Sequence, residues 1–261
     1  MIVGLAILLG MLVCGVAPSL VAPYDPFQQD LTQRFLGPSA QHLFGTDDFG
    51  RDIFSRVVFG TRISLLTAFA VVSASLVLGG IVGTIAGYRG GWIDELLMRT
   101  CDMFMAFPSI LLPLIVVVVL GPSLVNTAIA LAIRGWAPFA RLMRGQVLSV
   151  KENAYVDAAR ALGAGHWRIV RRYIWPNSIA PFIALAAIDM GFVILTAAGL
   201  GFLGLGAQPP TPEWGVMVAA GLQTFLISEW YAFFAGLTIA VAVLAFSLLG
   251  DELQNWLDPR A

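Results

Sequence analysis

Charged residues are scarce in this sequence. Asp, Glu, Lys and Arg make up 12% of its 261 residues, whereas hydrophobic residues make up 58% and the mean hydropathy is +0.83. An ordinary soluble domain has about 25% charged residues. This excludes a water-soluble globular domain, because there is too little polar surface to cover it. The net charge of −1 also gives no general attraction to nucleic acid.

Cysteine, histidine and lysine are also rare. Cys14 and Cys101 lie in or beside apolar runs, and His42 and His166 are far apart in the sequence. None of them has the spacing of a metal site or a disulfide framework. The single lysine, Lys151, is not part of a phosphate-binding G-x-x-x-x-G-K-[ST] loop. We therefore expect no catalytic site, no metal, no cofactor and no ATP site in this chain.

Long apolar runs, by contrast, are abundant. Only helices and closed barrels cross a bilayer without leaving backbone groups unpaired, and runs of about 20 residues without strand alternation indicate helices. We predict an all-α, polytopic transmembrane helical bundle of about six spans. The predicted spans cover residues 2–22, 62–88, 100–120, 123–146, 178–206 and 231–250.

The predicted organisation has three parts. Residues 1–61 hold the first span and an external polar segment, and residues 251–261 form a short cytoplasmic tail. Between them, residues 62–250 form a core of five spans that includes a cytoplasmic loop at 148–177. The first span lacks the positively charged start of a signal peptide, so we expect it to be retained.

Positive charges predict the orientation. Residues 141–172 hold seven Lys and Arg residues, whereas the loop 207–230 holds none. Cytoplasmic loops carry an excess of these residues, so loop 148–177 is expected inside the cell and loop 207–230 outside. Six spans then place both termini in the cytoplasm. The polar stretch after the first span would then lie outside. This placement conflicts with the positive-inside rule, because the stretch and its edge carry Arg34, Arg51, Arg56 and Arg62.

The cation-rich stretch 152–176, between two apolar spans, is the most informative part of the sequence. Asn153 is predicted to cap a short alanine-rich helix that ends at Gly163. Asp157 offers a charge to a cation on a partner. Helical spacing places four residues on one smooth, partly apolar face: Tyr155, Ala158, Ala159 and Leu162. We predict a docking site for a soluble protein, the alternative being an amphipathic helix on the lipid surface.

This stretch resembles the EAA loop of bacterial ABC-importer permeases. The matching positions are Asp157-Ala158-Ala159, Gly163 and the Ile174-Trp175-Pro176 run. The sequence departs from the family pattern at two places: Asp157 stands where Glu is usual, and Pro176 comes one residue earlier than the pattern has its proline. The resemblance implies that the ATPase subunit docks on a coupling loop formed by Tyr155, Asp157, Ala158, Ala159, Leu162, Gly163 and Pro176.

Further motifs narrow the family. HLFGTDDFGRDIFSRVVFGTRISL at 42–65 is similar to the signature of C-type permease subunits of dipeptide, oligopeptide and nickel importers. Residues 86–112, 121–133 and 201–217 match the same subfamily, as does the tail, so the resemblance covers nearly the whole chain. It implies the type I ABC importer permease (MetI-like) fold in a bacterial inner membrane.

The resemblance also implies partners and a substrate class. The chain would pair with a second, homologous permease subunit, two cytoplasmic ABC ATPases and an extracytoplasmic substrate-binding protein. The outer loop 207–230, with Trp214 and Trp230, is a candidate contact for the binding protein; the alternative is that these aromatic residues only anchor helices at the membrane interface. It would form half of the path for short peptides, with nickel or a metal chelate as the alternative. An ion-gradient-driven transporter and a membrane-embedded enzyme are rival classes, but paired broken helices and a catalytic constellation are not found.

Two charged residues are predicted at membrane depth. Arg134 lies in the middle of the span 123–146, and Asp189 lies about a dozen residues into 178–206. Ionised groups at this depth usually face a bundle interior or a watery path. We therefore predict that one or both line the translocation path, singly or as a pair; the alternative is a structural ion pair or snorkelling to the interface.

Glycine and proline positions predict how the spans pack. Gly79, Gly83 and Gly87 are spaced by four residues on one helix face, which favours close approach of a neighbouring helix. Pro108 and Pro113 are expected to interrupt the third span, because proline removes an intrahelical hydrogen bond.

Overall fold

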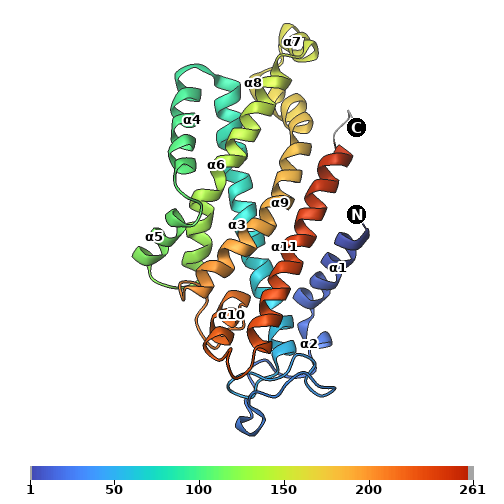
Figure 1. The fold of residues 1–261 in the computed structure, drawn as a ribbon. Helices are drawn as coiled ribbons and strands as arrows, with labels where there is room; N and C mark the ends of the chain where they lie inside the picture. Colours follow the sequence, from blue (N-terminus) through green and yellow to red (C-terminus); the bar gives the residue numbers. More distant parts are fainter. Residues whose placement is uncertain (1, 258–261) are drawn as a thin grey trace.

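The computed structural model describes residues 2–257 as a bundle of helices (Figure 1), with no strand in that part of the chain. The predicted all-α class is thereby confirmed. The elements in order are α1 (Ile2–Val16), α2 (Pro18–Val21), the 3₁₀ turn η1 (Leu31–Gln33), α3 (Ile53–Arg89), α4 (Gly91–Ala106), α5 (Leu111–Leu120), α6 (Leu124–Lys151), α7 (Ala154–Ala161), α8 (His166–Ile169), the π-helical turn η2 (Val170–Ile174), α9 (Trp175–Phe202), α10 (Trp214–Gln223) and α11 (Trp230–Leu257).

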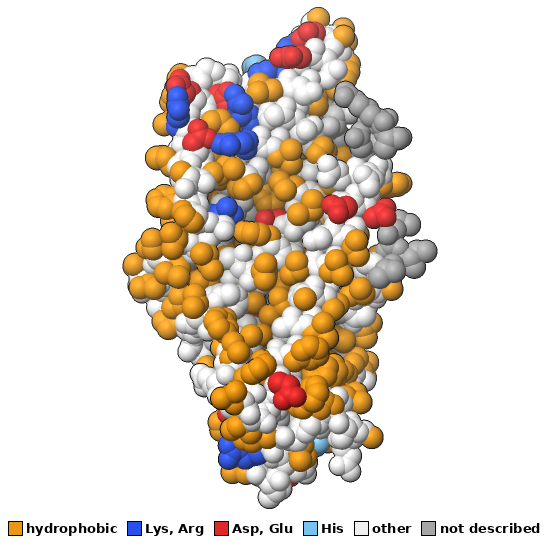
Figure 2. Space-filling view, viewed as in Figure 1, with side chains coloured by type: hydrophobic (Ala, Val, Ile, Leu, Met, Phe, Trp, Pro, Cys, Tyr) orange, Lys and Arg blue, Asp and Glu red, His pale blue; other side chains and the backbone are white. Residues whose placement is uncertain are grey.

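Three of the helical stretches are long and apolar enough to cross a membrane. They are α3, the continuous stretch from α8 to α9 (His166–Phe202), and α11. Each of the first two has 37 residues, or about 55 Å at 1.5 Å per residue, so its ends extend beyond a hydrocarbon core of about 30 Å. Figure 2 shows the same layering, with hydrophobic side chains over the middle of the face and most charges toward its two ends.

The predicted third span, 100–120, is not one straight helix. α4 and α5 meet at 87° across a break of four residues that includes Pro108, and only as a bent pair do they count as a fourth span. α1 has 15 residues, fewer than a crossing needs, and α6 carries four cations within its length. The count of six spans is therefore not reached by length and composition alone.

The predicted outer loop 207–230 contains a helix, α10. Trp214 begins it and is fully buried, with its Nε1 donating to the carbonyl of Val57 at 3.1 Å. A Cβ on Gly215 would lie 2.1 Å from the carbonyl oxygen of Ala198, so α10 lies directly against α9. Trp214 thus anchors α10 inside the bundle and is not available to an external partner.

Glycine packing joins the two central helices. A Cβ on Gly79 would lie 2.4 Å from Cβ of Phe139, and one on Gly83 would lie 2.3 Å from the carbonyl oxygen of Ala140. Only glycine allows α3 to approach α6 this closely, which confirms the prediction from the four-residue spacing. Behind this contact, Phe139 and Phe182 pack edge to face at 5.5 Å between ring centroids, and both are buried.

Candidate docking site

The stretch between α6 and α9, residues 152–176, is called the docking segment below. Its helix α7 projects from one end of the bundle (Figure 1). Asn153 precedes α7 as predicted, but its side chain does not cap that helix. Instead, its Nδ2 donates to the carbonyls of Val150 at 3.0 Å and Ser149 at 3.2 Å. Asn153 therefore satisfies the last carbonyls of α6, which have no partner within that helix.

The structure divides the predicted α7 face in two. Val156 and Ala159 are buried, at 0% and 6% exposed, and face the rest of the chain. Tyr155 and Leu162 are 43% and 88% exposed, and Ala158 is exposed between them. The prediction that Ala159 belongs to the docking face is therefore wrong, because Ala159 and Val156 together form the buried side of this short helix. The remaining docking face is apolar and open.

The other predicted docking residues lie around this face. Asp157 forms an exposed ion pair with Arg160 at 2.9 Å, and such surface pairs are weak, so its carboxylate stays accessible to a competing cation. Gly163 ends α7 with a φ of +81°, a backbone conformation that favours glycine. Pro176 is exposed in the first turn of α9, directly after the π-helical turn η2.

Two hydrogen bonds tie the docking segment and the adjoining end of α6 to the end of α3. Lys151 Nζ donates to the carbonyl of Gly87 at 2.8 Å, and the hydroxyl of Tyr88 lies 2.8 Å from Nδ1 of His166. Sequence reasoning missed both contacts. The signals available were the single lysine and an isolated histidine in a polar stretch, which give no indication of a partner 64 or 78 residues away. Movement of the docking segment would therefore act directly on α3.

Arg134 and Asp189 lie on α6 and α9, which pack together. The two form no ion pair or hydrogen bond with each other in the part of the chain that the structure describes. Arg134 Nε and Asp189 Oδ2 are both buried without a hydrogen-bond partner, and the guanidinium lies 5.6 Å from the ring centroid of Phe192. The structure brings both predicted path residues to one region without joining them directly.

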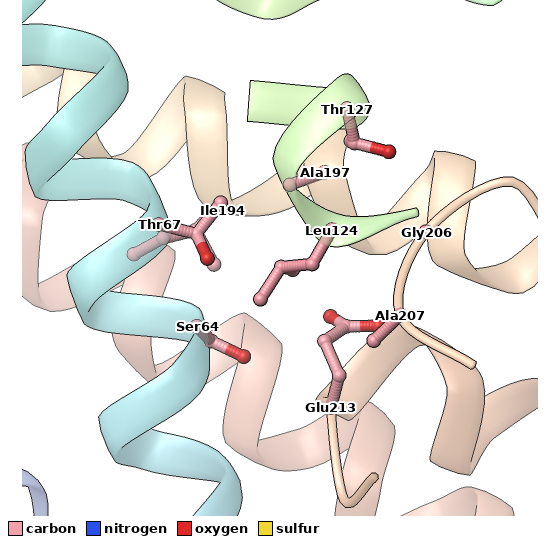
Figure 3. Close-up of a pocket in the computed structure, with 9 residues that line it drawn as sticks. All are labelled: Ser64, Thr67, Leu124, Thr127, Ile194, Ala197, Gly206, Ala207 and Glu213. Atoms are coloured by element: carbon pink, nitrogen blue, oxygen red, sulfur yellow. The ribbon is translucent and has the colours of Figure 1, made fainter. Parts of the chain in front are cut away.

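A small pocket marks the seam of α3, α6, α9 and α10 (Figure 3). Ser64 and Thr67 line it from α3, Thr127 from α6, and Glu213 from the turn before α10. The carboxylate of Glu213 accepts from the backbone N–H groups of Gly215 and Val216, both at 3.0 Å, and Thr127 donates to the carbonyl of Leu205 at 2.9 Å. The two bonds of Glu213 cap α10, and the bond of Thr127 joins α6 to the turn after α9, so the pocket lies where structural contacts meet.

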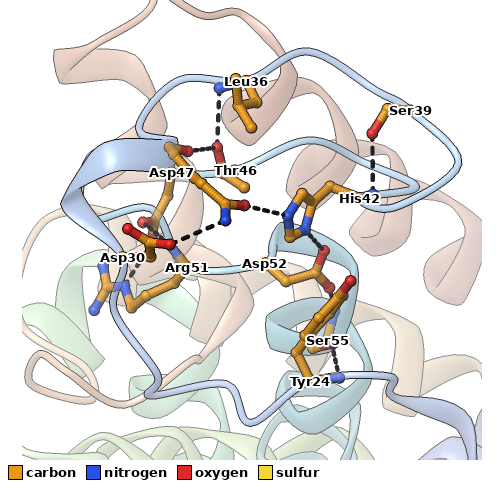
Figure 4. A network of polar contacts seen from close by, with 11 residues as sticks. Tyr24, Asp30, Leu36, Ser39, His42, Thr46, Asp47, Arg51, Asp52 and Ser55 are labelled. Carbon is orange, nitrogen blue, oxygen red and sulfur yellow. Dashed lines mark hydrogen bonds and ion pairs between the residues drawn. The ribbon is translucent and has the colours of Figure 1, made fainter.

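At the end opposite α7, residues 23–52 form a compact polar segment (Figures 1 and 4). Asp47 is its centre, with a side chain that is fully buried. Its Oδ1 accepts from the backbone N–H groups of Phe49 and Arg51, and its Oδ2 lies 2.7 Å from Nε of Arg51 and 3.6 Å from Nε of Arg56. One buried carboxylate thus organises a turn and two arginines of the motif at 42–65.

A second contact chain joins the polar segment to α3. Asp52 caps α3 by accepting from the backbone N–H of Ser55 at 2.7 Å, and its other oxygen lies 2.9 Å from Nδ1 of His42. Nε2 of His42 lies 2.9 Å from Oε1 of Gln33, whose amide donates to Asp30 at 2.9 Å. Capping by Asp52 makes α3 begin at Ile53, so residues 53–61 of the expected external segment belong to that helix.

Asp48 is the exception in the polar segment. Burial and the neighbouring charge of Asp47 raise the pKa of its carboxyl, and Arg51, 3.7 Å away, acts in the opposite direction. Its Oδ1 is buried without a hydrogen bond. The segment therefore contains one acid that holds it together and one that is poorly accommodated.

The structure has buried, paired charges at one end, an apolar layer of long helices in the middle and a projecting, exposed helix at the other end, which is the architecture of a membrane-embedded helical bundle. Residues 79–261 match the family of binding-protein-dependent transport system inner membrane components. The chain belongs to this family, and within it to the ABC-importer permeases of the dipeptide, oligopeptide and nickel group. It is accordingly a multi-pass protein of a bacterial inner membrane.

Several relatives match over most of their length. The chain is 46% identical to the dipeptide transport system permease protein DppC of Alkalihalophilus pseudofirmus, over 99% of this chain and 85% of that protein. It is 44% identical to the glutathione transport system permease protein GsiD of Pectobacterium atrosepticum (91% and 79% covered). It is also 44% identical to the nickel transport system permease protein NikC of Escherichia coli (91% and 86% covered).

Solved structures show the same fold. An inward-facing form of the MetNI methionine ABC transporter aligns with a TM-score of 0.63 at 20% identity, covering 78% of this chain and 97% of that one. An amino acid ABC transporter with histidines aligns with a TM-score of 0.58 at 16% identity (80% and 95% covered). The fold is therefore that of the MetI-like type I importer permeases, as predicted.

Proposed function

We propose that this chain forms half of the translocation path of an ATP-driven importer of short peptides and passes the motion of its ATPases into the membrane through the docking segment. The single observation that carries the docking role is the exposed face of Tyr155, Ala158 and Leu162 on a helix that projects from the bundle. An apolar side chain as exposed as Leu162 at a bundle end is suited to insertion into a groove on a partner.

Short peptides are the proposed substrate class. The relatives that support it carry the names of dipeptide, D,D-dipeptide and glutathione permeases, and glutathione is itself a small peptide. The nickel permease at 44% identity keeps nickel or a metal chelate as the second candidate. Uptake of a labelled dipeptide and of ⁶³Ni by cells that carry the complete transporter distinguishes the two, and nickel uptake without dipeptide uptake would overturn the peptide assignment.

The proposed assembly is a heterodimer with a second, homologous permease, bound to two ATPase subunits in the cytoplasm and a substrate-binding protein outside. The docking segment and both termini would face the cytoplasm, because the cation-rich stretch 141–172 lies at the α7 end. The polar segment, at the opposite end, would then face the binding protein. Hydrolysis of ATP takes place on the partner subunits in this scheme.

The proposed mechanism is alternating access. Association of the ATPases upon ATP binding would move α7, and Lys151 and His166 would carry that movement to α3 through Gly87 and Tyr88. Because α3 packs on α6 through glycines, the two helices would move as one unit and open the path outward. Hydrolysis would return the path to its inward-open state. Arg134 and Asp189 are proposed to line that path.

The docking role is tested by co-purification of the complete transporter. Asp157→Arg and Gly163→Trp are expected to lose the ATPase subunits while the permease pair stays in the membrane. Glu95→Arg on α4 is the matched control, because it makes the same charge reversal at an exposed site, 73% exposed, away from α7. If both docking variants retain the ATPases and normal ATP turnover, the docking segment is not the coupling element.

A further inference from the structure

An apolar groove lies between α3 and the docking segment, and it is separate from the exposed face of α7. α3 contributes Ile81 and Ile85 on one side, and Trp167 and Trp175 line the other side, with Arg171 also in the lining. The isoleucines are 48% and 44% exposed and Trp167 is 73% exposed. No part of the described chain covers these side chains, so the groove is open to whatever surrounds the bundle at this level.

The groove lies at the edge of the apolar layer. Residues 63–88 of α3 carry no charged side chain, and Arg89 ends the helix one turn after Ile85. On the other side, the cations of residues 168–172 precede the uncharged run that begins at Tyr173. Tryptophan is enriched at this boundary of membrane proteins, where its ring meets the headgroups. The isoleucines therefore face acyl chains, and the arginine lies at headgroup depth.

Three arginines at this edge, Arg168, Arg171 and Arg172, have no partner among residues 2–257, the part of the chain that the structure describes. All three are exposed, and none of them forms an ion pair or hydrogen bond with another residue of the described chain. Some other arginines at this end are paired, as Arg144 is with Asp94 at 2.6 Å and Arg160 with Asp157 at 2.9 Å. A cluster of free guanidinium groups beside an apolar groove is complementary to a phosphate that carries hydrocarbon chains.

We propose that this groove binds an anionic phospholipid, with an acyl chain along Ile81 and Ile85 and its phosphate on Arg171 and the neighbouring arginines. Each Lys or Arg near an anionic membrane surface contributes about 1 kcal/mol, and basic pockets between membrane helices hold anionic headgroups. A permease subunit is the less fitting occupant, because charged residues are depleted at the cores of protein interfaces. A phospholipid supplies an acyl chain at the depth of the isoleucines and a phosphate at the depth of the arginines.

The position of the groove gives the lipid a role in coupling. The elements that form it, α3 and the α8–η2 turn, are the same elements that the Tyr88–His166 hydrogen bond joins at 2.8 Å. Arg171 belongs to the π-helical stretch Val170–Ile174, and such stretches are frequent at functional sites. A lipid that bridges both walls would hold the docking segment against α3 during the transport cycle.

The test is native mass spectrometry of the complete transporter, titrated with phosphatidylglycerol and with phosphatidylcholine of the same acyl chains. The wild type is expected to bind phosphatidylglycerol at least about tenfold more tightly than phosphatidylcholine. The triple variant Arg168→Gln, Arg171→Gln and Arg172→Gln is expected to lose this preference. Arg99→Gln, which removes one exposed arginine from α4, is the control and is expected to keep it.

A photo-crosslinking residue in place of Ile85 then locates the site. Crosslinks to phosphatidylglycerol that decline in the triple variant support the proposal. An unchanged lipid preference in the triple variant overturns it, as does a wild type that binds both lipids equally. Crosslinks to the second permease in place of lipid also overturn it, and they would assign the groove to a subunit interface.

Discussion

The two ends of this molecule treat charge and apolar surface in opposite ways. In the polar segment, the side chain of Asp47 is fully buried and that of Arg51 is 7% exposed, and the two are bonded to each other. In the docking segment, the charges are exposed and Leu162 is 88% exposed. Three of its arginines have no partner among the residues that the structure describes. The polar segment is complete within one chain. The docking segment leaves charged and apolar side chains exposed, and these are available to other molecules.

This difference predicts where stability and function separate. A buried charge that is hydrogen-bonded on all sides is costly to disturb, because its removal leaves its partners unpaired in a desolvated place. An exposed side chain without intrachain contacts contributes little to folding, so a change there usually stays within about 0.5 kcal/mol. Substitutions in the polar segment should therefore reduce stability, and substitutions on the α7 face should reduce assembly without affecting the fold.

The largest expected effect comes from Asp47→Ala. It leaves Arg51 buried without its 2.7 Å partner and removes the acceptor of two backbone N–H groups. We expect a loss of about 3–5 kcal/mol in the free energy of unfolding. Thermal unfolding of the detergent-purified protein, followed by fluorescence, measures it. A loss below about 1 kcal/mol would show that the polar segment does not depend on this carboxylate.

The same contrast explains what the sequence could predict. Hydrophobic runs identify α3, α9 and α11 because apolar composition alone fixes a membrane helix. Glycines at 79, 83 and 87 identify the α3–α6 contact, since one helix face shows the spacing. The bounds of α7 follow from local signals as well, because Gly163 requires a positive φ and alanines favour the helix.

Features that depend on distant contacts were missed or misplaced. The 87° bend between α4 and α5 is more than the prolines alone specify, and Trp214 is buried because α3 offers the carbonyl of Val57 to its indole. Ala159 faces inward because the bundle, not the helical pattern, decides which side of α7 is covered. Asn153 bonds to α6 for the same reason: two helices meet there, and its side chain reaches the carbonyls of the preceding one.

A smaller effect is expected at the hydrogen bond between Tyr88 of α3 and His166 of α8. Tyr88→Phe removes the hydroxyl that lies 2.8 Å from Nδ1 of His166 and preserves the ring packing. One hydrogen bond of this kind contributes about 1 kcal/mol or less to stability. If the link transmits motion, the variant should hydrolyse ATP at nearly the normal rate while peptide uptake falls. An equal fall in both activities would instead indicate a damaged assembly.

Asp48→Asn should act in the opposite direction to Asp47→Ala. Because burial raises the pKa of Asp48, the folded state favours its protonated form. The resulting penalty is absent below the unfolded pKa of about 3.9 and is complete above the raised folded value. The variant should therefore be as stable as the wild type or slightly more stable at pH 7, by less than about 0.5 kcal/mol. This difference should vanish toward pH 3, as unfolding curves at the two pH values would show.

The smallest expected change in stability is that of Leu162→Ser. The side chain is 88% exposed and caps no cavity, so its removal takes no packed surface from the fold, and the free energy of unfolding should stay within about 0.5 kcal/mol of the wild type. Binding of the ATPase subunits should nevertheless weaken, because exposed apolar anchors carry much of an interface's energy. Val156→Ser, on the buried side of the same helix, is the matched control and should lose stability first. If Leu162→Ser unfolds the protein as readily as Val156→Ser does, α7 is held by its own chain on both faces, and the contrast between the two ends of the molecule fails.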